Sequence, residues 1–212
     1  AAIDDLVRES RGHPYLLLEL ARHLGSQATN RLPDIGLPTP QLRLDNVLRS
    51  RCDNLPESSR QLLETVAVAG HPVRMVDALA VCPQAPDLRS AAILRAARLV
   101  RTLGSDRGDQ IDTYHDRIRE SLLHALSAEA RTSIHLRLAR ALESSGAGPG
   151  VLYVHYAAGG DPAKASHYAL LAAAQAEEAM AFAQAGSMYQ AVLDLGQLPA
   201  AEQHHMRRRC AA

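Results

Sequence analysis

Apolar residues recur at helical spacing over most of this chain. Between residues 44 and 98, four stretches have an apolar residue every three or four positions. They are residues 44–55, a stretch that begins at Pro56 and ends at Gly70, residues 75–81 and residues 87–98. That period is typical of amphipathic helices with one face in a core. Four helices are therefore predicted in this part of the chain.

Two short stretches have strand character instead. Residues 99–103 alternate between apolar and polar side chains, and residues 110–114 follow after the polar, glycine-flanked segment 104–109. Such a pair of stretches is typical of a β-hairpin with a loose tip. Helices followed by a hairpin predict a winged-helix domain, which we place at residues 44–126.

From residue 117 onward the pattern is helical throughout, broken only by glycine-rich turns such as 146–150 and 159–162. Alanine dominates here, with a few tyrosines among the alanines, so that small residues let helices approach closely and large ones fill the gaps. We expect antiparallel helix pairs of a tetratricopeptide-like kind over residues 127–212, although the chain has no Trp for that repeat's early position. The predicted fold class is mainly α, a winged helix followed by these pairs.

The first 43 residues predict a separate, smaller unit. Residues 1–25 contain two short helices interrupted at Gly12 and Pro14, and residues 26–43 carry several prolines that break both helix and strand, so that we expect a linker there. The chain begins with Ala1, inside a predicted helix. We therefore expect it to be a segment of a longer protein.

Charge and cysteine content narrow the classes of function. The 212 residues carry 23 basic and 23 acidic side chains, so no overall field attracts nucleic acid or anionic lipid. The three cysteines are far apart, and no apolar run reaches the roughly 20 residues that span a bilayer. We expect a cytoplasmic protein that does not contact membranes.

The chemistry of nucleotide hydrolysis is missing from the sequence. Lys164 is the only lysine, and it stands between Ala163 and Ala165 rather than after a glycine, whereas a phosphate-binding P-loop requires a Gly-Lys pair. No nucleophile and base stand at a spacing typical of catalysis, and the adjacent His204 and His205 face different sides of a helix. We expect no catalytic residue, no metal site and no ATPase activity in this chain alone.

Two triplets carry the functional signal. Gly12-His13-Pro14 lies within a run of the form ES-x-G-x-P-x-x-L-x-E-L, and Tyr114-His115-Asp116 follows the predicted hairpin. With the winged helix and the helix pairs in this order, the chain resembles the regulatory half of a STAND-class signal-transduction ATPase, a class of large nucleotide-switched bacterial regulators related to apoptotic and plant-immunity ATPases. Residues 1–25 would then be the end of the ATPase lid.

The resemblance implies roles for two residues. Pro14 would pack against the adenine ring of a bound nucleotide, and His115 would contact the β-phosphate of ADP and hold the inactive state. A structural explanation stays open for both triplets, because Gly12 and Pro14 also suit a helix junction and Asp116 also suits a helix N-cap. ATP or ADP would be bound only by the parent protein, between this segment and a P-loop domain of the same chain.

The resemblance also implies a function. The segment would couple nucleotide state to an effector and contact protein partners through its helical repeats, and the parent ATPase would be of a kind often fused to a serine/threonine protein kinase or a transcriptional effector. The alternative is a winged-helix DNA-binding regulator with a helical dimerisation tail. It depends on four arginines of the predicted helix 87–98 and the first strand of the wing: Arg89, Arg95, Arg98 and Arg101. Nearby aspartates would repel a phosphate backbone, so that we rank DNA binding second.

Overall fold

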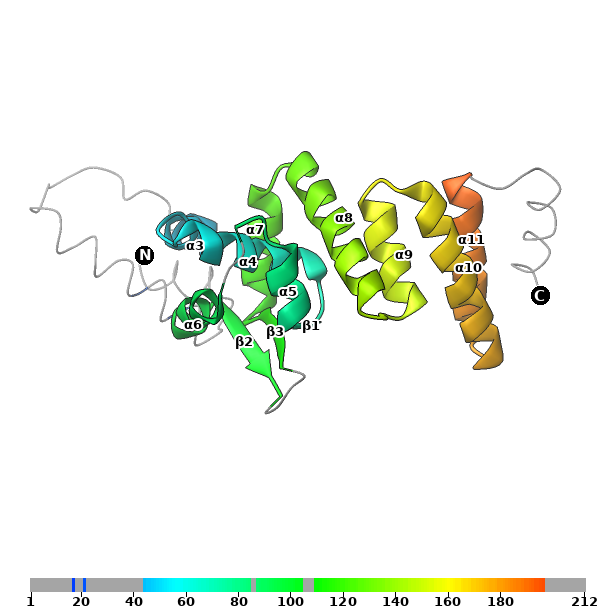
Figure 1. Cartoon of the computed structure of the whole chain (residues 1–212). Helices are drawn as coiled ribbons and strands as arrows, with labels where there is room; N and C mark the ends of the chain where they lie inside the picture. The colour runs from blue at the N-terminus through cyan, green and yellow to red at the C-terminus, as the bar shows by residue number, and fades with distance from the viewer. Residues whose placement is uncertain (1–16, 18–20, 22–43, 85–86, 105–108, 197–212) are drawn as a thin grey trace, which may run out of the picture.

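The computed structural model describes residues 17, 21, 44–84, 87–104 and 109–196 (Figure 1). The predicted linker and, apart from Leu17 and Ala21, the predicted helices of residues 1–25 lie outside this range. Within it the chain is mainly helical, with nine helices and a small three-stranded sheet. The mainly α fold class is thus confirmed for the described residues.

The first part of the structure combines five helices with the sheet. In chain order the elements are α3 (Leu44–Asp53), α4 (Glu57–Ala69), β1 (Val73–Arg74), α5 (Met75–Val81), α6 (Leu88–Ala96), β2 (Val100–Leu103), β3 (Gln110–Thr113) and α7 (Asp116–Ala125). Each predicted helix and both hairpin strands are present within one or two residues of the expected bounds. The sequence pattern missed β1, which is two residues long.

β3 is the central strand of the sheet. It pairs antiparallel with both neighbours, giving the order β1-β3-β2, and Ile111 stands opposite Val73 on one side and Thr102 on the other. Ile111 is fully buried, as expected for an apolar residue in the middle of a sheet whose inner face is covered by helices. The sheet therefore fixes where the chain enters α7.

Gly70 ends α4 and makes room for a tie from α7. It adopts a left-handed conformation with φ of 77°, in which a side chain is strained, and a Cβ there would lie 2.5 Å from the guanidinium of Arg119. Arg119 donates from Nε to the carbonyl oxygen of Ala67, 3.1 Å away in the last turn of α4. The positively charged Arg119 thus provides a hydrogen-bond donor for one of the carbonyl groups at the C-terminus of α4.

The second part of the structure is a row of helices that run alternately up and down, as Figure 1 shows. They are α8 (Ala128–Ser144), α9 (Pro149–Ala158), α10 (Pro162–Glu178) and α11 (Phe182–Leu195), and each contacts its neighbour in the chain. Ser127 caps α8 by accepting a hydrogen bond from the Ala130 amide, and Gly196 ends α11 in a left-handed conformation. None of the helices in the described part of the chain is both long and apolar enough to cross a bilayer.

One hydrophobic core runs through both parts. It begins at α3 and continues without a break through α7, α8 and α9 to Ala165 of α10. A smaller cluster, made of Ala173, Ala176, Ala185 and Tyr189, joins α10 to α11. The boundary that we placed at residue 126 is therefore not a gap in the core.

Gly159 allows the end of α9 to touch the backbone of α8. A Cβ at this position would lie 2.8 Å from the carbonyl oxygen of His155, 2.9 Å from the amide nitrogen of Leu136 and 3.0 Å from its Cα. All of these are backbone atoms, which cannot swing aside as a flexible side chain does. A larger residue at position 159 must push the two helices apart.

We predict that Gly159→Ala lowers the free energy of unfolding by about 1–3 kcal/mol, the usual cost of overpacking a tight contact. The matched control is Gly150→Ala in the same helix, where a Cβ meets nothing within 4 Å. That variant should be unchanged or slightly more stable, because alanine favours helix more than glycine does. Chemical unfolding followed by circular dichroism measures both, and equal stability of the two variants would contradict the close approach.

Candidate functional site

His115 stands where β3 gives way to α7. Its Nδ1 accepts a hydrogen bond from the backbone amide of Arg117 at 3.1 Å, so that the imidazole is the N-cap of α7. A neutral histidine whose Nδ1 accepts carries its proton on Nε2. The ring is half-buried, and its cap fixes Nε2–H as a donor beside a helix N-terminus, where the backbone dipoles favour an anion.

His115, not Asp116, is the N-cap of this helix, so that the structural alternative left open for this triplet is wrong about the capping residue. Asp116 is the first residue within α7 and is exposed, whereas the extended backbone of His115 places its side chain over the free amide groups. Sequence preferences favour aspartate at an N-cap. Here the end of the strand determines which residue precedes the helix, and that residue is the histidine.

Pro14, the second predicted nucleotide contact, lies outside the described residues. The structure therefore places only one of the two predicted residues.

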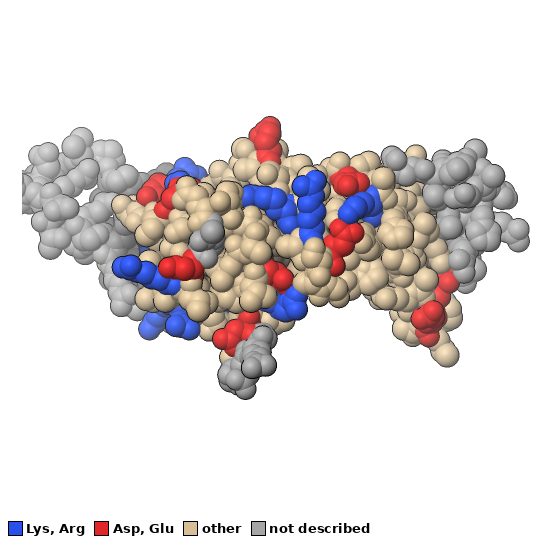
Figure 2. Space-filling model, viewed as in Figure 1, with Lys and Arg blue, Asp and Glu red and all other residues tan. Residues whose placement is uncertain are grey.

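The four arginines of the DNA-binding alternative have different surroundings. Arg89 and Arg95 are exposed on α6, whereas Arg101 on β2 forms an ion pair of 2.7 Å with Asp112 across the hairpin. On the face of the molecule that Figure 2 shows, acidic and basic atoms are interspersed rather than separated. A phosphate backbone would have to displace Asp112 before it could bind Arg101.

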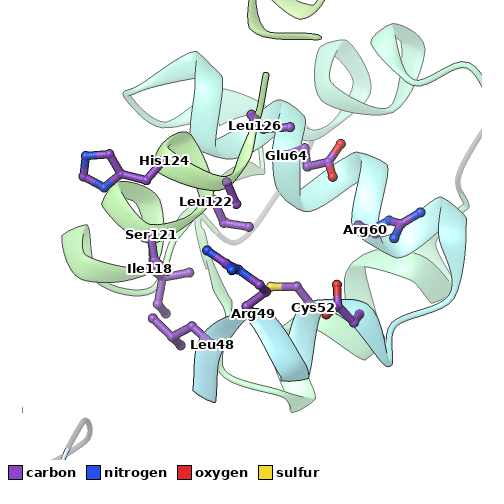
Figure 3. A pocket seen from close by; sticks show the side chains of 12 residues that line it. Leu48, Arg49, Cys52, Arg60, Glu64, Ile118, Ser121, Leu122, His124 and Leu126 are labelled. Atoms are coloured by element: carbon purple, nitrogen blue, oxygen red, sulfur yellow. The ribbon is translucent and has the colours of Figure 1, made fainter. Parts of the chain in front are cut away.

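A pocket of about 450 Å³ lies between α3, α4 and α7 (Figure 3). Its lining combines apolar side chains from α3 and α7 with charged side chains from α3 and α4. The lining residues are Leu48, Arg49, Cys52, Asp53, Arg60, Glu64, Ile118, Ser121, Leu122, His124, Ala125 and Leu126.

Burial changes the pKa of two ionisable groups that line this pocket. Burial raises the pKa of the Cys52 thiol to about 11, so that it stays protonated and is a poor nucleophile at neutral pH. Burial also raises the pKa of Glu64, with the nearby Arg60 opposing the shift.

Three histidines meet where the first part of the structure joins the helix row. His71 follows α4, His135 lies on α8 and His155 on α9. The Nδ1 atoms of His135 and His155 are 2.9 Å apart, close enough for one to donate a hydrogen bond to the other, and the rings of His71 and His155 meet edge to face at 5.9 Å. Because the three residues are far apart in the sequence, no local spacing predicted this cluster.

Burial favours the neutral form of two of these histidines, His135 and His155. His155 is 1% exposed, and burial, followed by the charges of His135 and His71, lowers its pKa to about 4. Burial and the charge of Arg131 also lower the pKa of His135. The Nε2 atoms of His71 and His155 are buried with no hydrogen-bond partner among the described residues, so that polar groups are retained there at an energetic cost.

The single lysine also belongs to a cluster that the sequence did not indicate. Lys164 on α10 donates to both carboxylate oxygens of Glu143 on α8, at 2.7 and 3.0 Å, and the hydroxyls of Tyr156 and Tyr168 donate to the same carboxylate. These bonds lower the pKa of Glu143 to about 2 and raise that of Lys164. The cluster joins three helices, and its lysine stays charged, so that it is no nucleophile.

Over the described residues, no three histidine, cysteine or carboxylate side chains are arranged so that they could hold a metal ion. Comparisons with protein families, with curated proteins and with solved structures find no match to this chain.

We predict that the protein loses stability as the pH falls from 6.5 towards about 4. Over this range the histidines bind protons in the unfolded state, where their pKa is about 6.5, but His155 does not in the folded state, where its pKa is about 4. Because the pKa of His155 is lower in the folded state than in the unfolded state, its stabilising effect is fully present above pH 6.5. That effect is lost as the pH falls from 6.5 towards about 4. Each such histidine contributes a slope of up to about 1.4 kcal/mol per pH unit.

The measurement is the free energy of unfolding between pH 7 and pH 5, above the range in which carboxylates with ordinary pKa values near 4 protonate. His155→Gln should flatten the dependence, because it removes the buried titrating group. The matched control is His124→Gln at an exposed position on α7. Equal slopes for the two variants would show that the buried cluster is not responsible.

Proposed function

We propose that this chain is the regulatory and protein-interaction segment of a nucleotide-switched signalling ATPase of the STAND class. In this proposal a P-loop domain of the same parent chain binds ATP or ADP, and the segment relays the nucleotide state to an effector, such as a fused serine/threonine kinase or a transcriptional regulator, in the cytoplasm. The segment itself performs no catalysis.

The arrangement of the first part supports a winged helix. Helix α4 is followed by β1, by helices α5 and α6 and then by the hairpin β2–β3, and the central position of β3 gives the sheet order β1-β3-β2. This is the order of elements expected of a winged-helix domain. The hairpin then leads directly into α7, where the class carries its phosphate-sensing histidine.

The observation that carries the proposal is the cap that His115 makes on α7. Because Nδ1 is occupied by the Arg117 amide, the neutral ring has its donor on Nε2. A hydrogen bond from Nε2–H to a phosphate oxygen is assisted by the charge of the phosphate. Such a contact exists only when the P-loop domain closes on this segment, so that His115 interacts differently with the two states.

The helix row supports the interaction role. Tyr156 and Tyr189 are buried among alanines such as Ala169 and Ala185, as in tetratricopeptide-like stacks. A shallow groove of about 590 Å³ opens between Tyr153 of α9 and the α11 residues Ser187, Gln190 and Asp194. In the proposed function this side of the row contacts protein partners.

In the parent protein, we predict that His115→Ala weakens ADP retention and raises basal signalling. A lost charge-assisted hydrogen bond is worth roughly 1.5–3 kcal/mol, which shifts the ratio of closed to open states by about ten- to a hundredfold. Pro14→Ala should lower nucleotide affinity without favouring either state, because a proline on the adenine ring would remain there in both. Nucleotide release and a signalling reporter measure these effects.

His115→Ser is the matched control for the helix cap. Serine is a good N-cap and preserves that role, but it has no group that reaches a phosphate as Nε2–H does. If His115 contacts ADP, the Ser and Ala variants lose retention equally. If it only caps α7, the Ser variant behaves like the original protein and the proposal fails.

A second candidate function is DNA binding, favoured by the exposed Arg89 and Arg95 on α6, the third helix of the proposed winged helix. We predict no binding to random duplex at physiological salt, because Arg101 is already paired with Asp112. Fluorescence anisotropy at increasing salt measures this. A steep salt dependence that Arg89→Gln and Arg95→Gln abolish would favour the DNA-binding regulator instead.

A further inference from the structure

A groove between α5 and α8 has a basic lining. It has a volume of about 520 Å³ and crosses the junction between the first part of the structure and the helix row. On the face that Figure 2 shows, basic atoms lie over the middle of the molecule, with acidic atoms beside them. The lining residues are Asp77, Ala80, Val81, Arg137, Arg140, Ala141, Ser144 and Ser145.

The one carboxylate in this groove is already neutralised. Arg74 donates hydrogen bonds to both carboxylate oxygens of Asp77, from Nε at 2.7 Å and from Nη2 at 3.2 Å. The Ser145 hydroxyl donates to the same carboxylate at 3.3 Å. Asp77 is also mostly buried. It therefore offers little repulsion to an anion that enters the groove.

Two arginines in the groove have capacity to bind a further anion. Arg137 and Arg140 are three residues apart and so lie on the same side of α8. Arg137 donates to the Ser133 carbonyl at 3.4 Å and lies within electrostatic range of Glu64. The exposed guanidinium of Arg140 makes no ion pair or hydrogen bond with any described residue.

The groove also has an apolar floor. Ala80, Val81 and Ala141 form it, and Val76, one turn before Ala80 on α5, is 66% exposed. Because residues four apart share one side of a helix, Val76 extends this apolar surface beyond Ala80. A ligand that matches both the arginines and the apolar surface of this groove has carboxylates next to an apolar side chain.

We propose that this groove binds an acidic peptide segment of a partner protein. Arg137 and Arg140 hold its carboxylates, and an apolar side chain of the peptide covers Val76 and Ala80. Charge complementarity selects this occupant, because neither arginine forms an ion pair with a described residue and the one carboxylate of the groove is paired with Arg74. The proposal does not depend on nucleotide switching, since no residue of the groove belongs to the proposed phosphate contact.

The test uses the full 212-residue chain and a fluorescein-labelled peptide of glutamate and alanine with one central leucine. We expect binding that weakens with salt and that falls about tenfold in the double variant R137Q/R140Q, as for the loss of two partly exposed ion pairs. Val76→Ser should weaken binding by a step that does not vary with salt. Circular dichroism checks that the double variant folds, because Arg137 is half-buried and its charge acts on Glu64 and Cys82.

The matched control is R89Q/R95Q, which removes the same charge from α6, outside the groove. It should leave peptide binding unchanged, as should His115→Ala, which separates this proposal from the nucleotide contact. No binding by the original chain, or an equal loss in both double variants, would overturn the proposal. Displacement of the peptide by an equal concentration of inorganic phosphate would also overturn it, by assigning the arginines to a phosphate ligand.

Discussion

The arrangement of the whole structure depends on α8 being packed on two sides. Leu138 and Ala139 are adjacent, so that their side chains point about 100° apart around the helix, yet both are fully buried. The first part of the structure covers one side through α4 and α5, and α9 covers the other. Removing either cover would expose apolar surface worth roughly 25 cal/mol per Å², which fixes the helix row on the first part.

Polar groups at this junction reduce the stability that such packing provides. The histidine cluster leaves buried nitrogen atoms without partners, and Arg74, Asp77 and Ser145 use charge to join α5 to the end of α8. Apolar side chains would pack there without these desolvation costs. What the polar groups add is direction, because hydrogen bonds require a particular orientation of the two parts whereas apolar contacts tolerate several.

Local patterns were sufficient to predict most of the elements but not the tertiary clusters. The helical period and the glycines at 70 and 196 indicated helix bounds that the structure reproduces, because those signals act within a few residues. β1 was missed because two residues carry no period. The histidine cluster and the groups around Glu143 were missed because their members become neighbours only when α8, α9 and α10 pack together.

The same reasoning explains the partial prediction of the candidate site. A hairpin running into a helix placed His115 at a helix start, but the identity of the capping residue depended on where the strand ends, and sequence preference for aspartate pointed one residue too far. The pocket and the basic groove lie between helices that are distant in the chain. Their linings follow from packing, to which a single sequence gives no direct signal.

The continuous core limits how a switch at His115 can act. Ile118, one turn after His115 on α7, is fully buried in the core that also holds Leu63 of α4 and Leu138 of α8. Close-packed cores of this kind shift between discrete arrangements rather than deforming gradually. In the proposed function, a phosphate contact at His115 therefore acts on α7 together with the core residues packed around Ile118, and not on the end of the strand alone.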